Sequence, residues 1–277
     1  MPLAGQRALI TGAGSGLGRA LALRLAAHGW RVACSDRDLA AAQATLALIE
    51  KTGGRGLALA LDVSRDDAFV EPVAGIAADW GGLDLLVNNA GVATAGTVAE
   101  ADLAQWRFAI EINLLGCVRG ARAVIPLMSA QGAGHIVNVA SFAGIANPPA
   151  LASYSATKAA VISLSETLRF ELAPHGVGVS VACPSFFRTN LMATSQASAP
   201  PGAANPAPQM ERIVNKLMDT ATVTADDVAA DIHDAVLKNR FLVITHGDAR
   251  ARYHIKRLAP ETFYKLARNA TAGFLKK

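Results

Sequence analysis

Short apolar runs rich in β-branched residues alternate along the chain with longer stretches in which apolar positions recur every three or four residues. A continuous apolar run of about four to eight residues predicts a buried strand, and the longer spacing predicts an amphipathic helix. The helical spacing is clearest over Leu17–His28 and Ser153–Ala173. Seven runs are predicted to be strands: Arg7–Thr11, Arg31–Ser35, Leu57–Leu61, Leu83–Asn88, His135–Ala140, Gly178–Cys183 and Phe241–Thr245.

This alternation of strands and helices predicts a parallel sheet with helices on both faces, joined by right-handed crossovers. The strand runs are almost uninterrupted by polar residues, which is typical of strands covered on both faces. Asp38 and Ser153 are residue types that begin helices, and Gly29 and Gly176 are residue types that end them. The chain has 277 residues and no internal repeat. We therefore expect an α/β fold, a single doubly wound domain with a seven-stranded parallel sheet.

One stretch departs from the alternation. Residues Ala193–Gln209 contain Pro200, Pro201, Pro206 and Pro208 among small polar residues. Neither a helix nor a strand tolerates that density of proline. A loop after a strand end is either a lid over a ligand or a disordered excursion. Its position after the sixth predicted strand favours a substrate lid, which we place at residues 193–220.

Composition narrows the class of protein. The chain is 52% hydrophobic and 17% charged, which excludes a disordered protein. No run approaches about 18 apolar residues, and Met1–Thr11 has no apolar segment of a secretory signal. The three cysteines, Cys34, Cys117 and Cys183, have neither zinc nor disulfide spacing. They are interpreted as buried thiols of a cytoplasmic protein, and no metal site is expected.

A glycine-rich turn follows the first predicted strand and precedes the first predicted helix. Glycines at such a turn let the backbone approach a pyrophosphate, and the helix N-terminus attracts the anion. No Gly-Lys-Ser/Thr sequence follows, which argues against a phosphate-loop nucleotide hydrolase. The turn therefore predicts dinucleotide binding, with these contact residues: Gly12, Ser15, Gly16, Leu17 and Gly18.

The second predicted strand ends next to two side chains of opposite charge, Asp36 and Arg37. A carboxylate at this place accepts the hydroxyls of an adenosine ribose and repels a 2′-phosphate, whereas a guanidinium could bind that phosphate. NAD is favoured because Asp36 is expected to lie closer to the ribose. NADP is the alternative, with Arg37 as its ligand.

Tyr154 and Lys158 are four residues apart and share one face of a predicted helix. A free phenol has a pKa of about 10, and a nearby ammonium or an oxidised nicotinamide would stabilise the phenolate. Tyr154 is then suited to exchange the proton of an alcohol while a nicotinamide carries the hydride. Ser141, at the end of the fifth predicted strand, can hydrogen-bond the carbonyl oxygen.

Taken in order, the motifs resemble those of the short-chain dehydrogenase/reductase family in its short form. They are Thr11-Gly-x-x-x-Gly16-x-Gly18, Asn88-Asn89-Ala90-Gly91, Asn113, Ser141 and Tyr154-x-x-x-Lys158, and the resemblance covers residues 7 to about 190. It implies a Rossmann-type domain and catalysis by Asn113, Ser141, Tyr154 and Lys158. In this family the lysine also binds the nicotinamide ribose, and the asparagine holds a water that links the lysine to solvent.

The resemblance also implies further cofactor contacts. Asp62 and Val63 correspond to the pair at the adenine, and Asn89, Ala90 and Gly91 to a turn beside the cofactor. Pro184-Ser185 stands where the family commonly has Pro-Gly, which puts the local backbone shape in question. Thr189 corresponds to a threonine at the cofactor's amide or phosphates, and Phe187 is expected to border the nicotinamide. Tyr154 and Lys158 belong to the same cofactor pocket.

The expected substrate is a small hydrophobic secondary alcohol or ketone. The predicted pocket wall contains no pair of arginines that could bind a carboxylate or phosphate, and Arg188 is the one cation expected nearby. Two alternatives remain: an NADP-dependent carbonyl or 3-oxoacyl reductase, and a cofactor-binding sensor without turnover. Ser141, Tyr154 and Phe186 are expected at the substrate, and the pocket wall is predicted to contain Phe142, Ile145, Ala146, Asn147, Pro148, Pro149, Leu151, Leu191 and Met192.

The C-terminal part of the chain is basic. From Lys238 to Lys277 there are ten lysines and arginines and two acids, and residues 246–277 form a basic extension. Within Tyr253–Leu275 apolar residues alternate with basic ones, which is consistent with an amphipathic helix that packs on protein, borders the pocket or lies on a membrane surface. Packing on protein is favoured over the membrane. A homodimer or homotetramer is expected from the family, and nucleic-acid binding is not.

Overall fold

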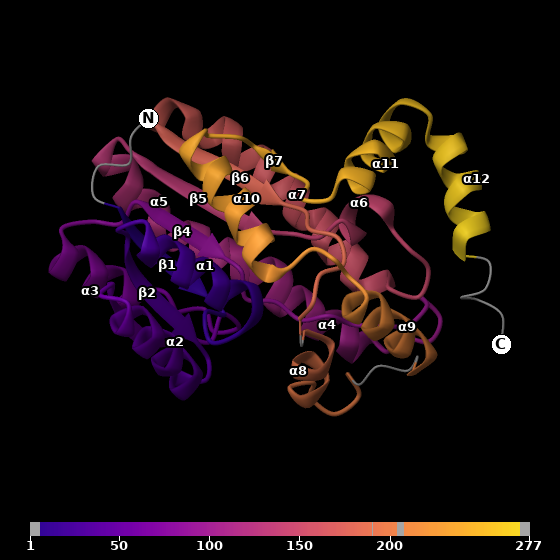
Figure 1. Cartoon of the computed structure of the whole chain (residues 1–277), viewed down its shortest axis with the longest axis horizontal. Helices are drawn as coiled ribbons and strands as arrows, with labels where there is room; N and C mark the ends of the chain where they lie inside the picture. Colours follow the sequence, from indigo (N-terminus) through magenta and orange to yellow (C-terminus); the bar gives the residue numbers. More distant parts are fainter. Residues whose placement is uncertain (1–5, 190, 204–207, 272–277) are drawn as a thin grey trace.

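A seven-stranded parallel sheet forms the centre of the computed structural model, which describes residues 6–189, 191–203 and 208–271 (Figure 1). All seven predicted strands are present, and their ends lie within two residues of the predicted ones. The strands are β1 Arg7–Thr11, β2 Arg31–Asp36, β3 Arg55–Ala60, β4 Leu85–Asn88, β5 Gly134–Val139, β6 Val177–Ala182 and β7 Leu242–Val243.

The strand order is β3-β2-β1-β4-β5-β6-β7, and every neighbouring pair is parallel. The chain therefore runs outward from β1 in one direction and then resumes at β4 on the other side. The doubly wound α/β fold is confirmed. In folds of this kind ligands bind outside the carboxyl ends of the strands, where the order reverses. Here the order reverses between β1 and β4, so that place lies beyond the carboxyl ends of these two strands.

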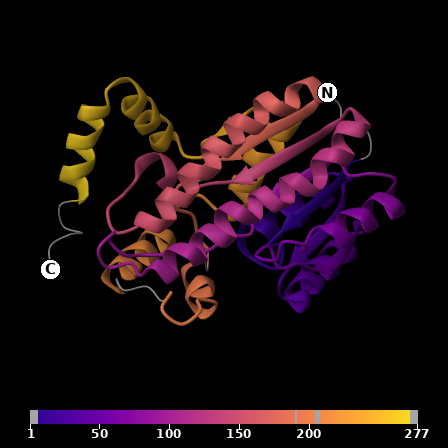
Figure 2. The same cartoon turned by 180° about the vertical axis from the view of Figure 1, so that it is seen from behind.

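Helices cover both faces of the sheet, as Figures 1 and 2 show from opposite sides. Ala8 and Ile10 of β1 pack on one face, together with apolar residues of α1 and α10, whereas Leu9 packs on the other face against α3, α5 and α7. Successive side chains of a strand point to opposite faces. Apolar residues are therefore needed at every strand position, which explains the uninterrupted runs in the sequence. The helices are α1 Gly16–Ala27, α2 Leu39–Lys51, α3 Val70–Trp80, α4 Leu103–Ile110, α5 Gly116–Gln131, α6 Ala143–Ala146, α7 Ala152–Leu172, α8 Leu191–Ala197, α9 Pro208–Asp219, α10 Ala225–Leu237, α11 Gly247–Leu258 and α12 Pro260–Thr271.

The predicted helix ends are confirmed in three cases and wrong in one. Asp38 caps α2 by accepting the N–H groups of Ala40 and Ala41. Gly29 and Gly176 follow helical segments with φ of 85° and 69°. Ser153, however, lies inside α7, which begins at Ala152. Its hydroxyl instead donates to the Gln105 side chain at 3.1 Å and lies 2.7 Å from the Thr94 hydroxyl, and both of these side chains are buried.

The proline-rich stretch is not a continuous loop. Helix α8 includes residues 193–197, and α9 begins at Pro208. Pro200 and Pro201 fall between the two helices, and Pro208 is the first helical residue of α9, where the missing proline N–H has no cost. Pro206 lies in 204–207, outside the described residues. The expectation of neither helix nor strand across Ala193–Gln209 was therefore wrong at both ends of the stretch.

The basic C-terminal segment forms two helices rather than one. A break at Ala259 separates α11 from α12, and α12 projects from the body of the molecule (Figure 1). We call α11 and α12 the C-terminal arm. Residues 272–277, with Phe274 and Leu275 of the predicted amphipathic helix, lie outside the described residues. In the described part of the chain no helix has the length and hydropathy needed to span a membrane.

Buried polar contacts join the strands at their amino ends. The Arg7 guanidinium pairs with the Asp84 carboxylate before β4, with a Nε–Oδ2 distance of 2.6 Å, and also donates to the Trp80 carbonyl at 3.1 Å. His135 of β5 is 3% exposed, and its Nε2 lies 2.8 Å from the Ser180 hydroxyl of β6. Ser180 in turn donates to the Arg240 carbonyl at 2.7 Å. These contacts fix the sheet at the edge opposite the expected ligand site.

Candidate active site

A cavity of about 1480 Å³ lies at the carboxyl ends of the strands. We call it the large cavity. It is bordered by the glycine-rich turn and the loops after β2, β3, β4, β5 and β6, and by α8, α9 and the C-terminal arm. All of the predicted site residues line it except Gly18 and Asn113, which lie behind its wall. The fold thus brings together residues that are spread over most of the sequence.

Three glycines of the glycine-rich turn stand where a side chain would be strained or would collide with neighbouring atoms. Gly12 and Gly16 have φ of 64° and 51°, a region that favours glycine. A Cβ on Gly18 would collide with the carbonyl of Gly12, so this glycine packs α1 against the turn. Ser15 is the N-cap residue of α1, which places the helix N-terminus on the cavity. This cradle fits the pyrophosphate of a dinucleotide.

The turn after β4 is tied to the glycine-rich turn. The Thr11 hydroxyl accepts the N–H groups of Asn89 and Ala90, both at 3.0 Å. The Asn89 side chain donates back to the carbonyls of Thr11 and Gly12, at 2.8 and 3.3 Å. The two loops that flank the reversal of the strand order therefore form one rigid unit.

Asp36 is held at the cavity by backbone groups, whereas Arg37 is exposed. The Asp36 carboxylate accepts the Gly14 N–H at 3.0 Å and the Asp38 N–H at 3.1 Å. A Cβ on Gly14 would lie 2.7 Å from an oxygen of this carboxylate. Asp36 is thus fixed beside the glycine-rich turn, and the Arg37 side chain lines the cavity from its exposed rim.

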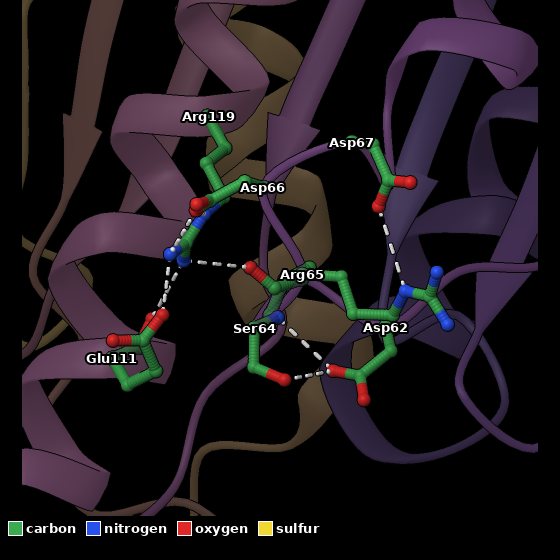
Figure 3. Close-up of polar contacts among 8 residues, drawn as sticks. Asp62, Ser64, Arg65, Asp66, Asp67, Glu111 and Arg119 are labelled. Atoms are coloured by element: carbon green, nitrogen blue, oxygen red, sulfur yellow. Dashed lines mark hydrogen bonds and ion pairs between the residues drawn. The ribbon is translucent and has the colours of Figure 1, made fainter.

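The loop after β3 carries the Asp62–Val63 pair and is braced from α5 (Figure 3). Asp62 accepts the N–H and the hydroxyl of Ser64, at 3.0 and 2.7 Å. Arg119 donates to the Val63 carbonyl at 3.1 Å and to Asp66 at 2.8 Å, and pairs with Glu111. The brace holds Val63 buried at the cavity while Asp62 stays exposed.

Asn113 lies in a π-helical segment, Glu111–Leu115, between α4 and α5. Its side chain is fully buried and clamps Val92, accepting the N–H at 2.8 Å and donating to the carbonyl at 2.9 Å. It also donates to the Thr157 hydroxyl at 3.1 Å. π-Helical segments occur frequently at functional sites. The family resemblance pointed to Asn113, but the sequence contained no signal for the π-helix or for Thr157 as a partner.

Tyr154 and Lys158 lie in the first turns of α7, and Ser141 is the second residue after β5. The Ser141 hydroxyl accepts the Ala143 N–H at 3.1 Å and is close enough to the Tyr154 phenol to lower its pKa. Lys158 is 4% exposed, and its Nζ donates to the Val139 carbonyl at 2.8 Å and lies 5.9 Å from the centre of the Tyr154 ring. A Cβ on Gly91 would lie 3.3 Å from that Nζ, so glycine leaves the space that the lysine occupies.

Burial works against charge on both catalytic candidates. It raises the pKa of the Tyr154 phenol, and the nearby Ser141 hydroxyl opposes the rise. Burial also lowers the pKa of the Lys158 ammonium. In the protein without a ligand, the balance of these effects raises the pKa of Tyr154.

Two buried thiols lie near this site. Cys117 and Cys183 are buried, and burial raises their pKa values to about 11 and about 12. Cys34 is buried too, and its pKa is raised to about 12 for the same reason. The prediction of buried thiols is confirmed. In the described part of the chain no group of three or more histidines, cysteines and acids could hold a metal ion.

The substrate end of the cavity corrects two expectations. Among the predicted wall residues, Ile145 does not line the large cavity but a second hollow between α7 and α11. Arg188 is exposed, donates to the Asp219 carbonyl at 3.3 Å and does not line the large cavity. The sequence reasoning missed wall residues of α9 and the C-terminal arm, among them Val214, Met218, Arg252, Lys256, Phe263 and Leu266.

Two contacts hold the segments after β6 in place. Ser195 of α8 accepts the Ala93 N–H at 2.8 Å, which ties α8 to the loop after β4. The Ser185 N–H donates to Nδ1 of His246 at 3.3 Å, and His246 Nε2 lies 3.0 Å from the Phe186 carbonyl. Ser185 is not among the described non-glycine residues with positive φ. Serine therefore fits where the family commonly has glycine.

Comparison with known proteins gives consistent matches. The model of the short chain dehydrogenase family matches residues 6–199. The "Probable oxidoreductase EphD" of Mycobacterium tuberculosis is 35% identical over 260 residues, covering 94% of this chain but 44% of the relative. This chain thus spans less than half the length of that relative. A 3-oxoacyl-[acyl-carrier-protein] reductase of Synechocystis is 37% identical over 190 residues, 68% of this chain and 77% of the relative.

Solved structures agree with the fold over almost the whole chain. A short chain dehydrogenase/reductase from Burkholderia phymatum, in complex with NAD, has a TM-score of 0.88 and 32% identity, and covers 95% of this chain and 96% of its own. A metagenomic short-chain oxidoreductase in complex with NADP has a TM-score of 0.69 and 29% identity, and covers 87% of this chain and 96% of its own.

Proposed function

Because this chain belongs to the short-chain dehydrogenase family of oxidoreductases, we propose that it transfers a hydride between NAD(H) and a hydrophobic secondary alcohol or ketone. One observation carries the proposal. Tyr154, Ser141 and Lys158 line the same cavity as the glycine-rich turn. A dinucleotide on that turn and a small alcohol at Tyr154 therefore share one enclosure.

The residues that would hold NAD(H) follow from the cavity wall. The glycine-rich turn and the N-terminus of α1 suit the pyrophosphate, and Asp36 suits the adenosine ribose. The family pattern assigns Asp62–Val63 to the adenine, Asn89–Gly91 and Lys158 to the nicotinamide half, and Thr189 to the carboxamide or phosphates. The cavity volume of about 1480 Å³ exceeds the roughly 300–1,000 Å³ of an ordinary ligand pocket, which leaves room for a second molecule.

The protein groups divide the chemistry as follows. When bound, the nicotinamide supplies or accepts the hydride, and its oxidised ring carries a positive charge. Tyr154 exchanges the proton of the alcohol as general acid/base. Ser141 hydrogen-bonds the reacting oxygen and also stabilises the Tyr154 phenolate, because its hydroxyl already lowers the phenol's pKa. Lys158 holds the ribose, and Asn113 fixes the loop at Val92.

An NADPH-dependent reduction is the second candidate. The observation in its favour is that Arg37 lines the large cavity at the rim beside Asp36, where a guanidinium could reach a 2′-phosphate. Similarity to a 3-oxoacyl-[acyl-carrier-protein] reductase supports the same alternative. We favour NAD because backbone N–H groups fix the Asp36 carboxylate, whereas the Arg37 side chain is exposed.

Replacement of Tyr154 by phenylalanine tests the proposal. The Tyr154→Phe variant should lose at least about 100-fold in kcat, in line with removal of a general acid/base, and should keep its affinity for NADH. Turnover is followed as NADH absorbance with a panel of secondary alcohols and ketones, and binding as energy transfer from the three tryptophans. Tyr253→Phe is the matched control, because Tyr253 does not line the large cavity.

Two results would contradict the proposal in different ways. Near-normal turnover in Tyr154→Phe would overturn the role of the tyrosine. NADH binding without turnover by the unaltered protein, across the whole panel, would instead favour a cofactor-binding sensor.

A further inference from the structure

The C-terminal arm brings a lysine to the substrate end of the large cavity. Lys256 of α11 lies between that cavity and the second hollow, lines both and is half-buried. Its ammonium donates to the Ile145 carbonyl, near the C-terminal end of α6, and lies 5.8 Å from the centre of the Phe263 ring of α12. The backbone carbonyl occupies one of the three N–H donors of the ammonium. The remaining donors are available to a ligand.

This lysine has no acidic partner among the described residues, where every salt bridge joins other side chains. The acid of the arm that lines the cavity, Asp248, pairs with Arg252 at 3.3 Å. Burial lowers the pKa of Lys256, which is the effect of desolvation without a compensating negative charge. A partly desolvated cation on a cavity wall is stabilised by an anion that enters the cavity.

The surroundings of Lys256 are apolar. Phe263, Leu266 and Ala267 of α12 line the large cavity, yet no residue of α12 is buried. Leu266 remains 55% exposed and Tyr264 59% exposed. The apolar side of α12 therefore borders the cavity and is only partly covered by protein atoms. An apolar molecule in the cavity would cover it.

Lys256 is connected to the proposed chemistry through the segment after β5. Ile145, whose carbonyl it contacts, lies four residues after Ser141, across the single turn of α6. Ser141, Tyr154 and Lys256 all line the large cavity. A molecule with its reacting oxygen at Ser141 and Tyr154 would therefore share the cavity with the Lys256 ammonium, and a chain of several carbon atoms would join the two places.

We propose that Lys256 is a carboxylate subsite, and that the substrate is an aliphatic secondary alcohol or ketone with a carboxylate several carbons from the reacting carbon. This rests on the proposed hydride transfer and narrows its substrate class. It also replaces Arg188 by Lys256 as a cation of the substrate end, where Arg252, paired with Asp248, and Arg268 line the cavity too. One ammonium acts as a point charge and suits a single carboxylate, whereas a phosphate ester more often takes an arginine fork.

The decisive comparison uses 7-hydroxyoctanoate and its methyl ester, which share one carbon skeleton. With NAD, kcat/KM for the acid should exceed that for the ester at least tenfold. Lys256→Met should abolish this preference, leave the ester within twofold of its original value, and keep NADH binding. Lys256→Arg should retain the preference.

Lys265→Met is the matched control, because Lys265 is exposed on α12 and does not line the cavity. Equal loss on acid and ester in Lys256→Met would mean that the lysine merely caps α6, and would overturn the proposal.

A binding measurement separates this proposal from the proposed activity. Calorimetric titration of the NADH-loaded protein with octanoate needs no turnover, and binding should weaken at least tenfold in Lys256→Met. Lysine-dependent octanoate binding without turnover of any alcohol would leave the subsite standing and overturn the hydride transfer. Octanoate binding that is absent, or unchanged in Lys256→Met, would overturn the subsite. Tighter, lysine-dependent binding of octyl phosphate would overturn the carboxylate assignment in favour of a phosphate.

Discussion

Asp36 and Arg37 are adjacent in the sequence and have different surroundings in the fold. Two backbone N–H groups fix the Asp36 carboxylate beside the glycine-rich turn, and the Arg37 side chain extends into solvent at the cavity rim. In the sequence, the charges of these two residues favour different cofactors: the carboxylate favours NAD and the guanidinium favours NADP. The structure adds that one of them is preorganised and the other is not, and a preorganised group gives up less conformational freedom on binding.

Replacement of Asp36 tests which of the two residues selects the cofactor. Asp36→Ser should weaken NADH binding about tenfold, because a bidentate acceptor for the ribose is lost, and should strengthen NADPH binding because a repelling charge is removed. Both affinities are measured by energy transfer from tryptophan to the reduced cofactor. Arg37→Ala is the companion variant, with NADH binding unchanged. Tighter NADPH binding by the original protein, lost in Arg37→Ala, would reverse the assignment.

Some residues of the candidate site were predicted from the sequence, and others were missed. Tyr154 and Lys158 are four residues apart in one helix, so their common face follows from helix geometry. Lys256 contacts the carbonyl of Ile145, 111 residues away. Such a contact depends on how α11 leaves the sheet and produces no periodic signal. Thr157, the partner of Asn113, was missed for the same reason, since the hydrogen bond joins two different helices.

Elements were predictable where burial alone decides them. The strands covered on both faces require apolar residues at every position, and these runs are visible in the sequence. β7 is an edge strand of two residues, shorter than its predicted apolar run, because its pairing with β6 extends over Val181 and Ala182. The prediction of neither helix nor strand in the proline-rich stretch was wrong, because a high density of proline does not distinguish a loop from the connection between two short helices.

The ion pair between β1 and the start of β4 should be a large contributor to stability. The Asp84 side chain is 2% exposed, so Arg7→Met would leave a buried carboxylate without its partner. The expected loss is about 3–5 kcal/mol of the free energy of unfolding, measured by urea denaturation. Arg65→Met is the control, because the Arg65–Asp67 pair is 69% and 73% exposed and should matter by less than about 1 kcal/mol. A similar small effect in both variants would contradict this account.

At the scale of the whole molecule, the class of fold was predictable and the strand order was not. Alternating strands and helices imply a parallel sheet, but periodicity does not say which strands are neighbours. The order in the structure places the reversal between β1 and β4. That reversal explains why the large cavity lies there, and why residues as distant in sequence as Gly12 and Lys256 share its wall.

Stability of the whole molecule should decline in mild acid. Burial lowers the pKa of His135 to about 4, against about 6.5 in an unfolded chain. The unfolded chain therefore binds more protons between these values. The stabilisation is fully present above about pH 6.5, and is lost as the pH falls towards about 4, by up to roughly 3 kcal/mol.

Urea denaturation at pH 7.0 and pH 5.0 measures this dependence. His135→Gln should reduce the difference in unfolding free energy between the two pH values, whatever its effect on stability at pH 7.0. His175→Gln, at an exposed histidine, should leave the difference unchanged. The same pH dependence in the original protein and in His135→Gln would show that another group is responsible.

The position of the buried polar contacts has a consequence for how this chain can diverge. Arg7, Asp84 and His135 lie at the amino ends of the strands, and α8, α9 and the C-terminal arm lie beyond the carboxyl ends. Substitutions on the arm can therefore change which molecules the cavity accepts while the groups that secure the sheet stay intact. A library of variants confined to residues 247–271 should thus yield altered substrate selectivity with little loss of folded protein. New specificities can then arise without loss of the contacts that stabilise the sheet.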